Sequence, residues 1–245
     1  MAEESVFSMD NPLMKALGRL GDAMLLSVIF VLTCIPIVTI GAAVTALYYT
    51  GIKGVSGDDG YVWKYYTRSF KQNFKQSTLM WLLFLVVFGV LGFDIWFWLW
   101  QWKDLHNAIA KPFLFVSVVL ITLVFMTFLY TFGLQAKFDN KIKIQIRNGF
   151  LMSIKNFPTT LLMILIDLVV VWCFYYMPVI AVIVYIIIGF GGIGYLQSYL
   201  MYRCLLPFLP KQEEHDDLDF HIRLDDINES EDKDDVQEEI TNEDE

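Results

Sequence analysis

The sequence predicts an all-α fold, a polytopic bundle of membrane-spanning helices. Hydrophobic residues make up 56% of the chain and charged residues 18%, against roughly 45–50% and 25% in soluble domains. Four apolar stretches with at most one charge each reach about 20 residues, the length that a helix needs to cross about 30 Å of hydrocarbon. These stretches are residues 79–99, 113–134, 159–177 and 179–200.

The region before them, residues 11–50, can form either one bent span or two spans, 12–35 and 37–54. Pro36 lies between the two candidate spans, where it removes a backbone donor and disfavours helix at the preceding residue. Gly41 follows closely, and a small residue there lets two helices approach each other. The sequence therefore leaves open whether the chain has five spans or six.

The charge of the loops indicates which helix ends face the cytoplasm, because cytoplasmic loops carry an excess of Lys and Arg. Loops 55–77 and 136–158 are rich in these residues, and the connections 101–111 and 177–178 are poor in them. Six spans also place the N-terminal basic residues on the rich side. We therefore favour six transmembrane helices with both termini cytoplasmic; the alternative is five, with the N-terminus outside.

The C-terminal segment, residues 211–245, differs sharply in composition from the rest. It holds 17 acidic and 3 basic residues, a net charge of −14. A segment with so few apolar residues cannot bury enough surface to offset the entropy of ordering it. The sequence thus predicts a membrane helix bundle over residues 1–210 and an acidic, disordered cytoplasmic tail over residues 211–245.

A surface helix is predicted over residues 61–77, ahead of the span 79–99. It carries an aromatic stripe beside a basic stripe, a pattern that suits the surface of an anionic membrane. The aromatic residues are Trp63, Tyr66, Phe70 and Phe74, and the basic residues are Lys64, Arg68, Lys71 and Lys75. Two interpretations stay open: interfacial anchoring, and docking of another membrane subunit.

Three strings in the first part of the chain resemble the YesL-like bacterial membrane proteins, a family of unknown function. They are CIPIVTIGAA at 34–43, TALYY at 45–49 and RSFKQNFKQ at 68–76. The resemblance covers about residues 10–100. It implies a small multi-pass protein of the bacterial plasma membrane, of a kind often encoded near carbohydrate uptake systems of the ATP-binding-cassette type. It supplies no catalytic or binding residues to carry over.

Two acidic residues fall inside predicted spans. Asp167 lies about nine residues into the span 159–177, about 13 Å deep at 1.5 Å per residue, and Asp94 lies nearer the outer end of 79–99. A carboxylate at membrane depth is costly and faces the bundle interior. Asp167 is therefore the first candidate for a functional polar group, with hydrogen bonding inside the bundle as the alternative, and Asp94 is expected to reach water.

Glycines near the end of the last span fit the dinucleotide-binding pattern GxGxxG. The residues are Gly189, Gly191, Gly192 and Gly194. Because no βαβ unit can follow them, we interpret these glycines as sites of close helix packing rather than of nucleotide binding. Pro36 and Gly41 receive the corresponding roles of helix turn and close packing.

No residue pattern predicts an enzyme. The three histidines and three cysteines have no metal-ligand spacing, and no nucleophile or phosphate-loop motif occurs. We therefore expect no catalytic residues, no metal, no cofactor and no nucleic-acid partner. The expected partners are the lipid bilayer, permease subunits of a carbohydrate uptake system, and other copies of the chain in a homo-oligomer.

Two functions follow from these observations. The first is an accessory or scaffold component of a carbohydrate uptake system, acting through helix packing and the aromatic and basic helix 61–77. The alternative is a small self-contained transporter or channel whose polar path includes Asp167. The resemblance alone favours the first function, because the residues themselves support the two equally.

Overall fold

The computed structural model describes residues 12–56, 61–101 and 110–208. Every regular element in these ranges is helical, as the sequence predicts. The predicted tail, residues 211–245, lies outside the described ranges. The main helices are α1 (Pro12–Cys34), α2 (Ile40–Val55), α3 (Val62–Gln101), α4 (Ala110–Gln135), α5 (Ile142–Lys155), α6 (Phe157–Tyr176), α7 (Pro178–Val184) and α8 (Phe190–Leu205).

The helix is interrupted around Pro36, so the region 11–50 contains two helices, α1 and α2, rather than one bent span. Pro36 has an extended backbone, and a short 3₁₀ turn, η1 (Ile37–Thr39), leads into α2. The Thr39 hydroxyl donates to the carbonyl of Thr33 across this turn, at 2.5 Å. With 16 residues, α2 is about 24 Å long at 1.5 Å per residue, shorter than the hydrocarbon layer.

Five helical segments of the described chain are long and apolar enough to cross a membrane. They are Leu17–Cys34, Val62–Gln101, Ala110–Gln135, Phe157–Tyr176 and Pro178–Phe208. Because α2 is shorter, it is not among them, and most of its residues from Gly41 to Lys53 are buried. The chain is thus a multi-pass helical membrane protein.

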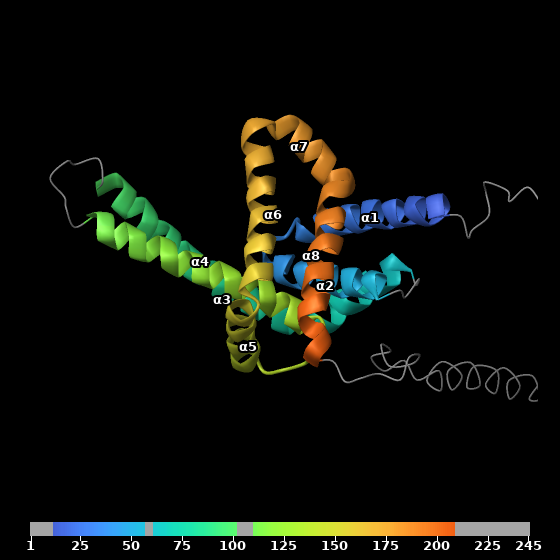
Figure 1. The fold of residues 1–245 in the computed structure, drawn as a ribbon, viewed down its shortest axis with the longest axis horizontal. Helices are drawn as coiled ribbons and strands as arrows, with labels where there is room; N and C mark the ends of the chain where they lie inside the picture. Colours follow the sequence, from blue (N-terminus) through green and yellow to red (C-terminus); the bar gives the residue numbers. More distant parts are fainter. Residues whose placement is uncertain (1–11, 57–60, 102–109, 209–245) are drawn as a thin grey trace, which may run out of the picture. The chain divides into compact units, whose positions relative to one another are not determined.

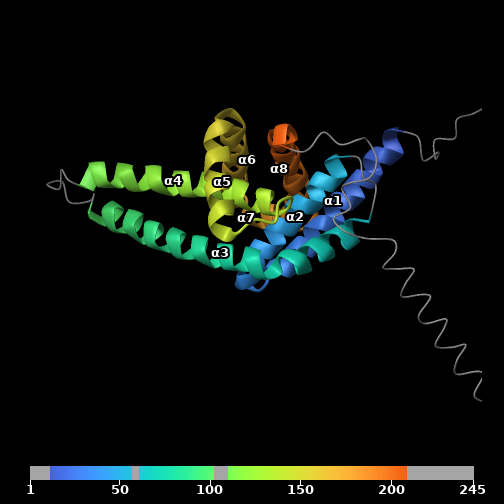
Figure 2. The same ribbon diagram turned by 90° about the horizontal axis from the view of Figure 1, so that it is seen from below.

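The surface helix predicted over 61–77 is not a separate element. It is the first part of α3, a single helix of 40 residues, because no glycine or proline interrupts the chain between its amphipathic part and its apolar part. The second part of α3 pairs with α4, and Figure 2 shows the two helices side by side. The first part packs instead on α1 and α2.

The last three helices form a hairpin, visible in Figure 1 as two arms closed by α7. The chain turns at Met177, and Pro178 begins α7. One turn of π-helix, η2 (Tyr185–Gly189), joins α7 to α8. A final 3₁₀ turn, η3 (Leu206–Phe208), follows α8.

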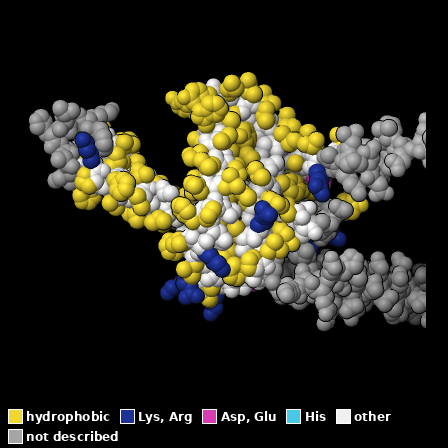
Figure 3. Space-filling model, viewed as in Figure 1, with side chains coloured by type: hydrophobic (Ala, Val, Ile, Leu, Met, Phe, Trp, Pro, Cys, Tyr) yellow, Lys and Arg dark blue, Asp and Glu magenta, His cyan; other side chains and the backbone are white. Residues whose placement is uncertain are grey.

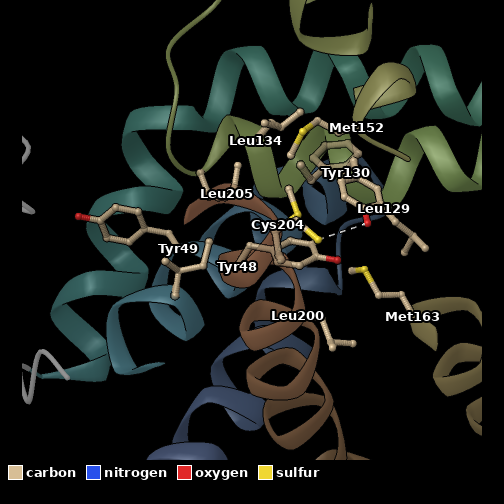
Figure 4. Close-up of a cluster of buried hydrophobic side chains, with 14 of the residues drawn as sticks. Tyr48, Tyr49, Leu129, Tyr130, Leu134, Met152, Met163, Leu200, Cys204 and Leu205 are labelled. Carbon is tan, nitrogen blue, oxygen red and sulfur yellow. Dashed lines mark hydrogen bonds between the residues drawn. The ribbon is translucent and has the colours of Figure 1, made fainter. Parts of the chain in front are cut away.

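The main hydrophobic core surrounds α2 where it meets α3, α4 and α8. Tyr48 and Tyr130 lie near its centre, with Met201, Cys204 and Leu205 of α8 packed around them. Figure 4 shows Tyr48, Tyr130 and Cys204 converging from three different helices. The Tyr130 hydroxyl is 3.8 Å from the Cys204 sulfur and 3.1 Å from the Thr160 hydroxyl, which ties α4 to α8 and α6.

Outside this core, apolar side chains face outward. Figure 3 shows them covering α6, α7 and the paired ends of α3 and α4. Exposed Leu, Val, Ile and aromatic residues are numerous on these helices, whereas a soluble protein rarely exposes large contiguous apolar patches. These surfaces suit contact with lipid, as the sequence predicts.

Several helix crossings depend on a missing side chain. A Cβ at Gly41 would strike the backbone of Ser77 on α3, one at Gly51 would strike Ser198 on α8, and one at Gly191 would strike the backbone of Ala23 on α1. The Gly191 amide also donates to the Ser27 hydroxyl at 2.6 Å. At Gly192 no atom comes within 4 Å of the added carbon.

We predict that Gly191→Ala destabilises the protein while Gly192→Ala does not. Both changes improve helix propensity equally, so the contrast isolates the contact with Ala23, where overpacking costs about 1–3 kcal/mol. Thermal unfolding in dodecyl maltoside, followed by size-exclusion chromatography, measures the difference. Equal midpoints for the two variants would contradict the α1–α8 crossing.

Candidate intramembrane binding site

Asp167 lies at the middle of α6, ten residues after its start and nine before its end. Its Oδ1 accepts a hydrogen bond from Gln197 Nε2 of α8 at 2.6 Å. Gln197 Oε1 in turn accepts from the Tyr48 hydroxyl of α2 at 3.1 Å. All donors in this chain of hydrogen bonds point toward the carboxylate, because a flipped Gln197 amide would set its Oε1 against Asp167 Oδ1, and both atoms only accept hydrogen bonds.

The three side chains line a cavity of about 210 Å³. Residues of α1, α2, α4, α6 and α8 contribute to it, and its polar side chains are Tyr48, Asp167 and Gln197. The rest of the lining is aliphatic, glycine or aromatic, the last group including Phe30, Phe125, Phe128 and Phe190. The site is thus a small polar spot in an aromatic cavity, the usual composition of a ligand pocket.

The fold brings these residues together through close contacts of α8 with α2. A Cβ at Gly194 would meet Leu47, so the missing side chain lets α8 lie against α2. The contact of Gly51 with Ser198 fixes the same two helices one turn further along. Gln197 lies between these two contacts, which holds its amide within reach of Tyr48.

The second oxygen of Asp167 has no hydrogen-bond partner among the described residues. Oδ2 is buried and accepts no hydrogen bond within the described structure. The other buried side-chain atoms without partners there belong to Thr78 and Gln145, which do not ionise. An unsatisfied carboxylate oxygen at membrane depth costs several kcal/mol. A ligand therefore gains the most binding free energy by donating a hydrogen bond to this atom.

Asp94 is arranged differently. Its Oδ1 accepts from the Trp98 indole at 3.0 Å and its Oδ2 from the Ser117 hydroxyl of α4. Both oxygens are therefore satisfied, and the residue pins α3 to α4. The sequence-based expectation that Asp94 simply reaches water is corrected: the side chain is half-buried and has a structural partner on each oxygen.

The aromatic residues of the predicted helix 61–77 do not form one membrane-facing stripe. Tyr66 is fully buried, and its hydroxyl lies 2.5 Å from that of Thr33 on α1. Phe70 stacks on Tyr66 and contacts Phe74, with ring centroids 6.2 Å and 5.5 Å apart. Trp63 is exposed. The stripe thus packs on α1 at one end and reaches the surface only in part.

The basic residues of that helix remain at the surface. Lys64, Lys71 and Lys75 are exposed, and Arg68 is half-buried and has an interaction partner. Lys53 at the end of α2 is buried instead, with its Nζ 5.4 Å from the centre of the Tyr65 ring. A basic surface therefore exists on α3 as the sequence suggests, but on one side of a helix that is otherwise packed.

The glycines of the last span divide into two kinds. Gly191 and Gly194 lie at crossings with α1 and α2. Gly192 faces open space, and Gly189 contacts the ring of Tyr185 in its own helix. The expectation of close packing against another helix is therefore wrong at Gly192 and Gly189, because the atoms of a neighbouring helix do not approach either position.

Sequence reasoning missed Tyr48 and Gln197. Gln197 is the one amide in the stretch 179–200, and an intramembrane amide is a signal that could have found it. Tyr48 carried no such signal, since tyrosine is common in spans. Within the described ranges, no group of three or more His, Cys, Asp or Glu side chains is placed to hold a metal ion.

Comparison with known proteins supports the family resemblance. Residues 23–95 match the family model described as "Protein of unknown function, DUF624", which is the family of YesL-like proteins. The chain is also 40% identical over 57 residues to the "Probable 4-amino-4-deoxy-L-arabinose-phosphoundecaprenol flippase subunit ArnE" of Hamiltonella defensa subsp. Acyrthosiphon pisum (strain 5AT). The matched segment is 23% of this chain and 50% of the relative, so this chain spans about half the length of the relative. No solved structure matches.

We predict that Gln197→Leu lowers stability more than Asp167→Leu does. Removing Gln197 leaves both carboxylate oxygens of Asp167 unpaired, at a cost of about 1–3 kcal/mol, whereas removing the half-satisfied carboxylate itself is nearly neutral. Unfolding by sodium dodecyl sulfate from mixed micelles measures both variants. A larger loss for Asp167→Leu would show that the carboxylate serves packing rather than binding.

Proposed function

We propose that this multi-pass protein, related over residues 23–95 to the YesL-like family, is a small membrane transport subunit. In this proposal the cavity at Asp167 holds the polar group of the transported molecule. The observation that carries it is the buried Oδ2 of Asp167, which has no hydrogen-bond partner in the described structure and belongs to a residue that lines a cavity formed by five helices. The family resemblance supports a bacterial plasma membrane as the location.

Three features favour binding over a purely structural role for Asp167. The carboxylate is oriented by a chain of two hydrogen bonds, so its free oxygen has a defined direction. The cavity around it is lined by aromatic rings, which attract cationic groups. The similarity to a flippase subunit over 57 residues supports a role in moving a molecule across or within the bilayer.

The topology belongs to the same proposal. Six transmembrane helices with both termini cytoplasmic put the basic ends of α3 and α5 on the cytoplasmic side and the α6–α7 turn on the outer side. Three exposed basic residues at the start of α5 support this orientation: Lys141 just before the helix, and Lys143 and Arg147 within it. Because α2 packs along the first, basic part of α3 and is not among the helices long enough to cross a membrane, five spans with the N-terminus outside is the alternative topology.

Complementation of a deletion strain tests the transport proposal. We expect Asp167→Asn to abolish the function of the protein, because the change removes the negative charge while keeping the volume. Asp94→Asn is the matched control and should complement, since Trp98 can still donate to the amide oxygen and the Ser117 hydroxyl can accept from the new NH₂ group. Membrane levels of each variant are compared by immunoblot, and full complementation by Asp167→Asn would overturn the proposal.

The exposed basic surface of α3 supports a second candidate function, the accessory component of a carbohydrate uptake system. Lys64, Lys71 and Lys75 are exposed, and the side chain of Trp63, next to Lys64 in the chain, is exposed as well. A basic surface with an aromatic residue suits an acidic face of a permease subunit. In this function the surface of α3 holds the partner and Asp167 is dispensable.

Affinity purification in mild detergent distinguishes the two functions. If the chain is an accessory subunit, permease subunits co-purify with the native protein and are lost from the variant Lys64→Glu, Lys71→Glu, Lys75→Glu. The control reverses the charge of Lys141, Lys143 and Arg147 at the start of α5, which is the same change of charge as in the test variant and should retain the partners. Recovery of the protein without permease subunits would rule out the accessory function.

A further inference from the structure

A second cavity lies between α6 and the helices that follow it. Its volume is about 440 Å³, and its lining includes Trp172 and Tyr176 of α6, Ala181 of α7, Ile188 of the π-helical turn and Gly192 of α8. The lining is almost wholly apolar. Turns of π-helix are frequent at functional sites, and here the turn shapes one wall of the cavity.

The two cavities are neighbours along one seam. Ile193 of α8 lines both of them. On α6, Asp167 and Val170 line the polar cavity and Trp172 and Tyr176 line the apolar one. At 1.5 Å per residue, the apolar cavity extends about 8–14 Å beyond Asp167 toward the α6–α7 turn.

The volumes suit a ligand that occupies both cavities. Alone, at about 210 Å³, it is smaller than the roughly 300–1,000 Å³ of ordinary small-molecule sites. Together with the apolar cavity it falls within that range. A ligand that used both would place a polar group against Asp167 and an apolar part between α6 and α7.

We infer that the ligand of this site is an amphiphile with a single hydrocarbon chain. A hydroxyl or ammonium group at the head of the chain donates a hydrogen bond to Asp167 Oδ2, and the chain lies in the apolar cavity beside Trp172 and Gly192. The inference rests on the proposed transport function and names its substrate class. It assigns a use to the unpartnered oxygen of Asp167 and to the open space at Gly192.

The direction of the ligand follows from the charge of the helix ends. Basic side chains lie toward the α5 end of α6, whereas the α6–α7 end is apolar in Figure 3. If the basic end is cytoplasmic, the hydrocarbon chain points toward the outer face and the head toward the cytoplasm. That is the orientation of a lipid of the cytoplasmic leaflet, with its head drawn toward the middle of the bilayer.

Photolabelling tests this inference on the full-length protein in nanodiscs of phosphatidylglycerol and phosphatidylethanolamine. The probes are hexadecylamine, hexadecanol and hexadecyl methyl ether, each with a diazirine in the chain. We expect the amine and the alcohol to label peptides that line the apolar cavity. The ether lacks a donor, so its labelling there should be about tenfold weaker, the ratio that one hydrogen bond to a charged group produces.

Two variants locate the head and the chain separately. Asp167→Leu should reduce labelling by the amine about tenfold, and Gly192→Leu, which fills the apolar cavity, should reduce labelling by the amine and the alcohol alike. The control, Gly89→Leu, changes a glycine of α3 that also faces open space but lies far along another helix, and should label as wild type.

The remaining outcomes separate this inference from the proposed function. Equal labelling by all three probes, unaffected by Asp167→Leu, would overturn the inference. The hydrocarbon chain of the probe would then bind without any contribution from a hydrogen bond between its head group and Asp167. Absence of labelling in the cavity, together with failure of Asp167→Asn to complement, would also overturn it while leaving a polar solute as the transported molecule. Complementation by Asp167→Asn would instead overturn the proposed transport function itself.

Discussion

The close packing around α2 is the constraint on which the rest of the structure depends. Helices in a bilayer gain little by burying apolar side chains from lipid that is equally apolar, so they associate through close contact and interhelical hydrogen bonds. In α2, the absence of a side chain at Gly41 allows close contact with α3, and its absence at Gly51 allows close contact with α8. The hydroxyls of Thr45 and Ser77, 2.8 Å apart, add a hydrogen bond to the first crossing.

That packing also positions the candidate site. Because the contacts of Gly51 and Gly194 fix α8 against α2, Gln197 and Tyr48 are held together independently of α6. The hydrogen bond from Gln197 then joins α6 to this rigid pair. Further along, α6 and α7 leave the apolar cavity between them. The site therefore combines a fixed half, on α2 and α8, with a half on α6 that is less tightly packed.

Sequence patterns predicted the fold well and the site in part. Apolar length identified the spans, and Pro36 marked a turn that the structure contains. Asp167 was found because a charge in an apolar run is conspicuous. The continuity of α3 was not predicted, because a change from amphipathic to apolar pattern resembles a boundary although nothing in the chain ends the helix. The partners of Asp167 could not be predicted, since they depend on how α2 and α8 cross.

The contrast between the two intramembrane acids shows why Asp167 is the better functional candidate. Both occupy apolar helices, where a carboxylate is expensive to bury. At Asp94 the fold supplies a donor to each oxygen, so the cost is offset within the structure and the residue needs no ligand. At Asp167 the fold supplies one donor and a cavity. A residue kept only for packing would be served better by an apolar side chain of equal volume. An unpaired acceptor on a residue that lines a cavity is the arrangement expected of a site that completes its hydrogen bonds with a ligand.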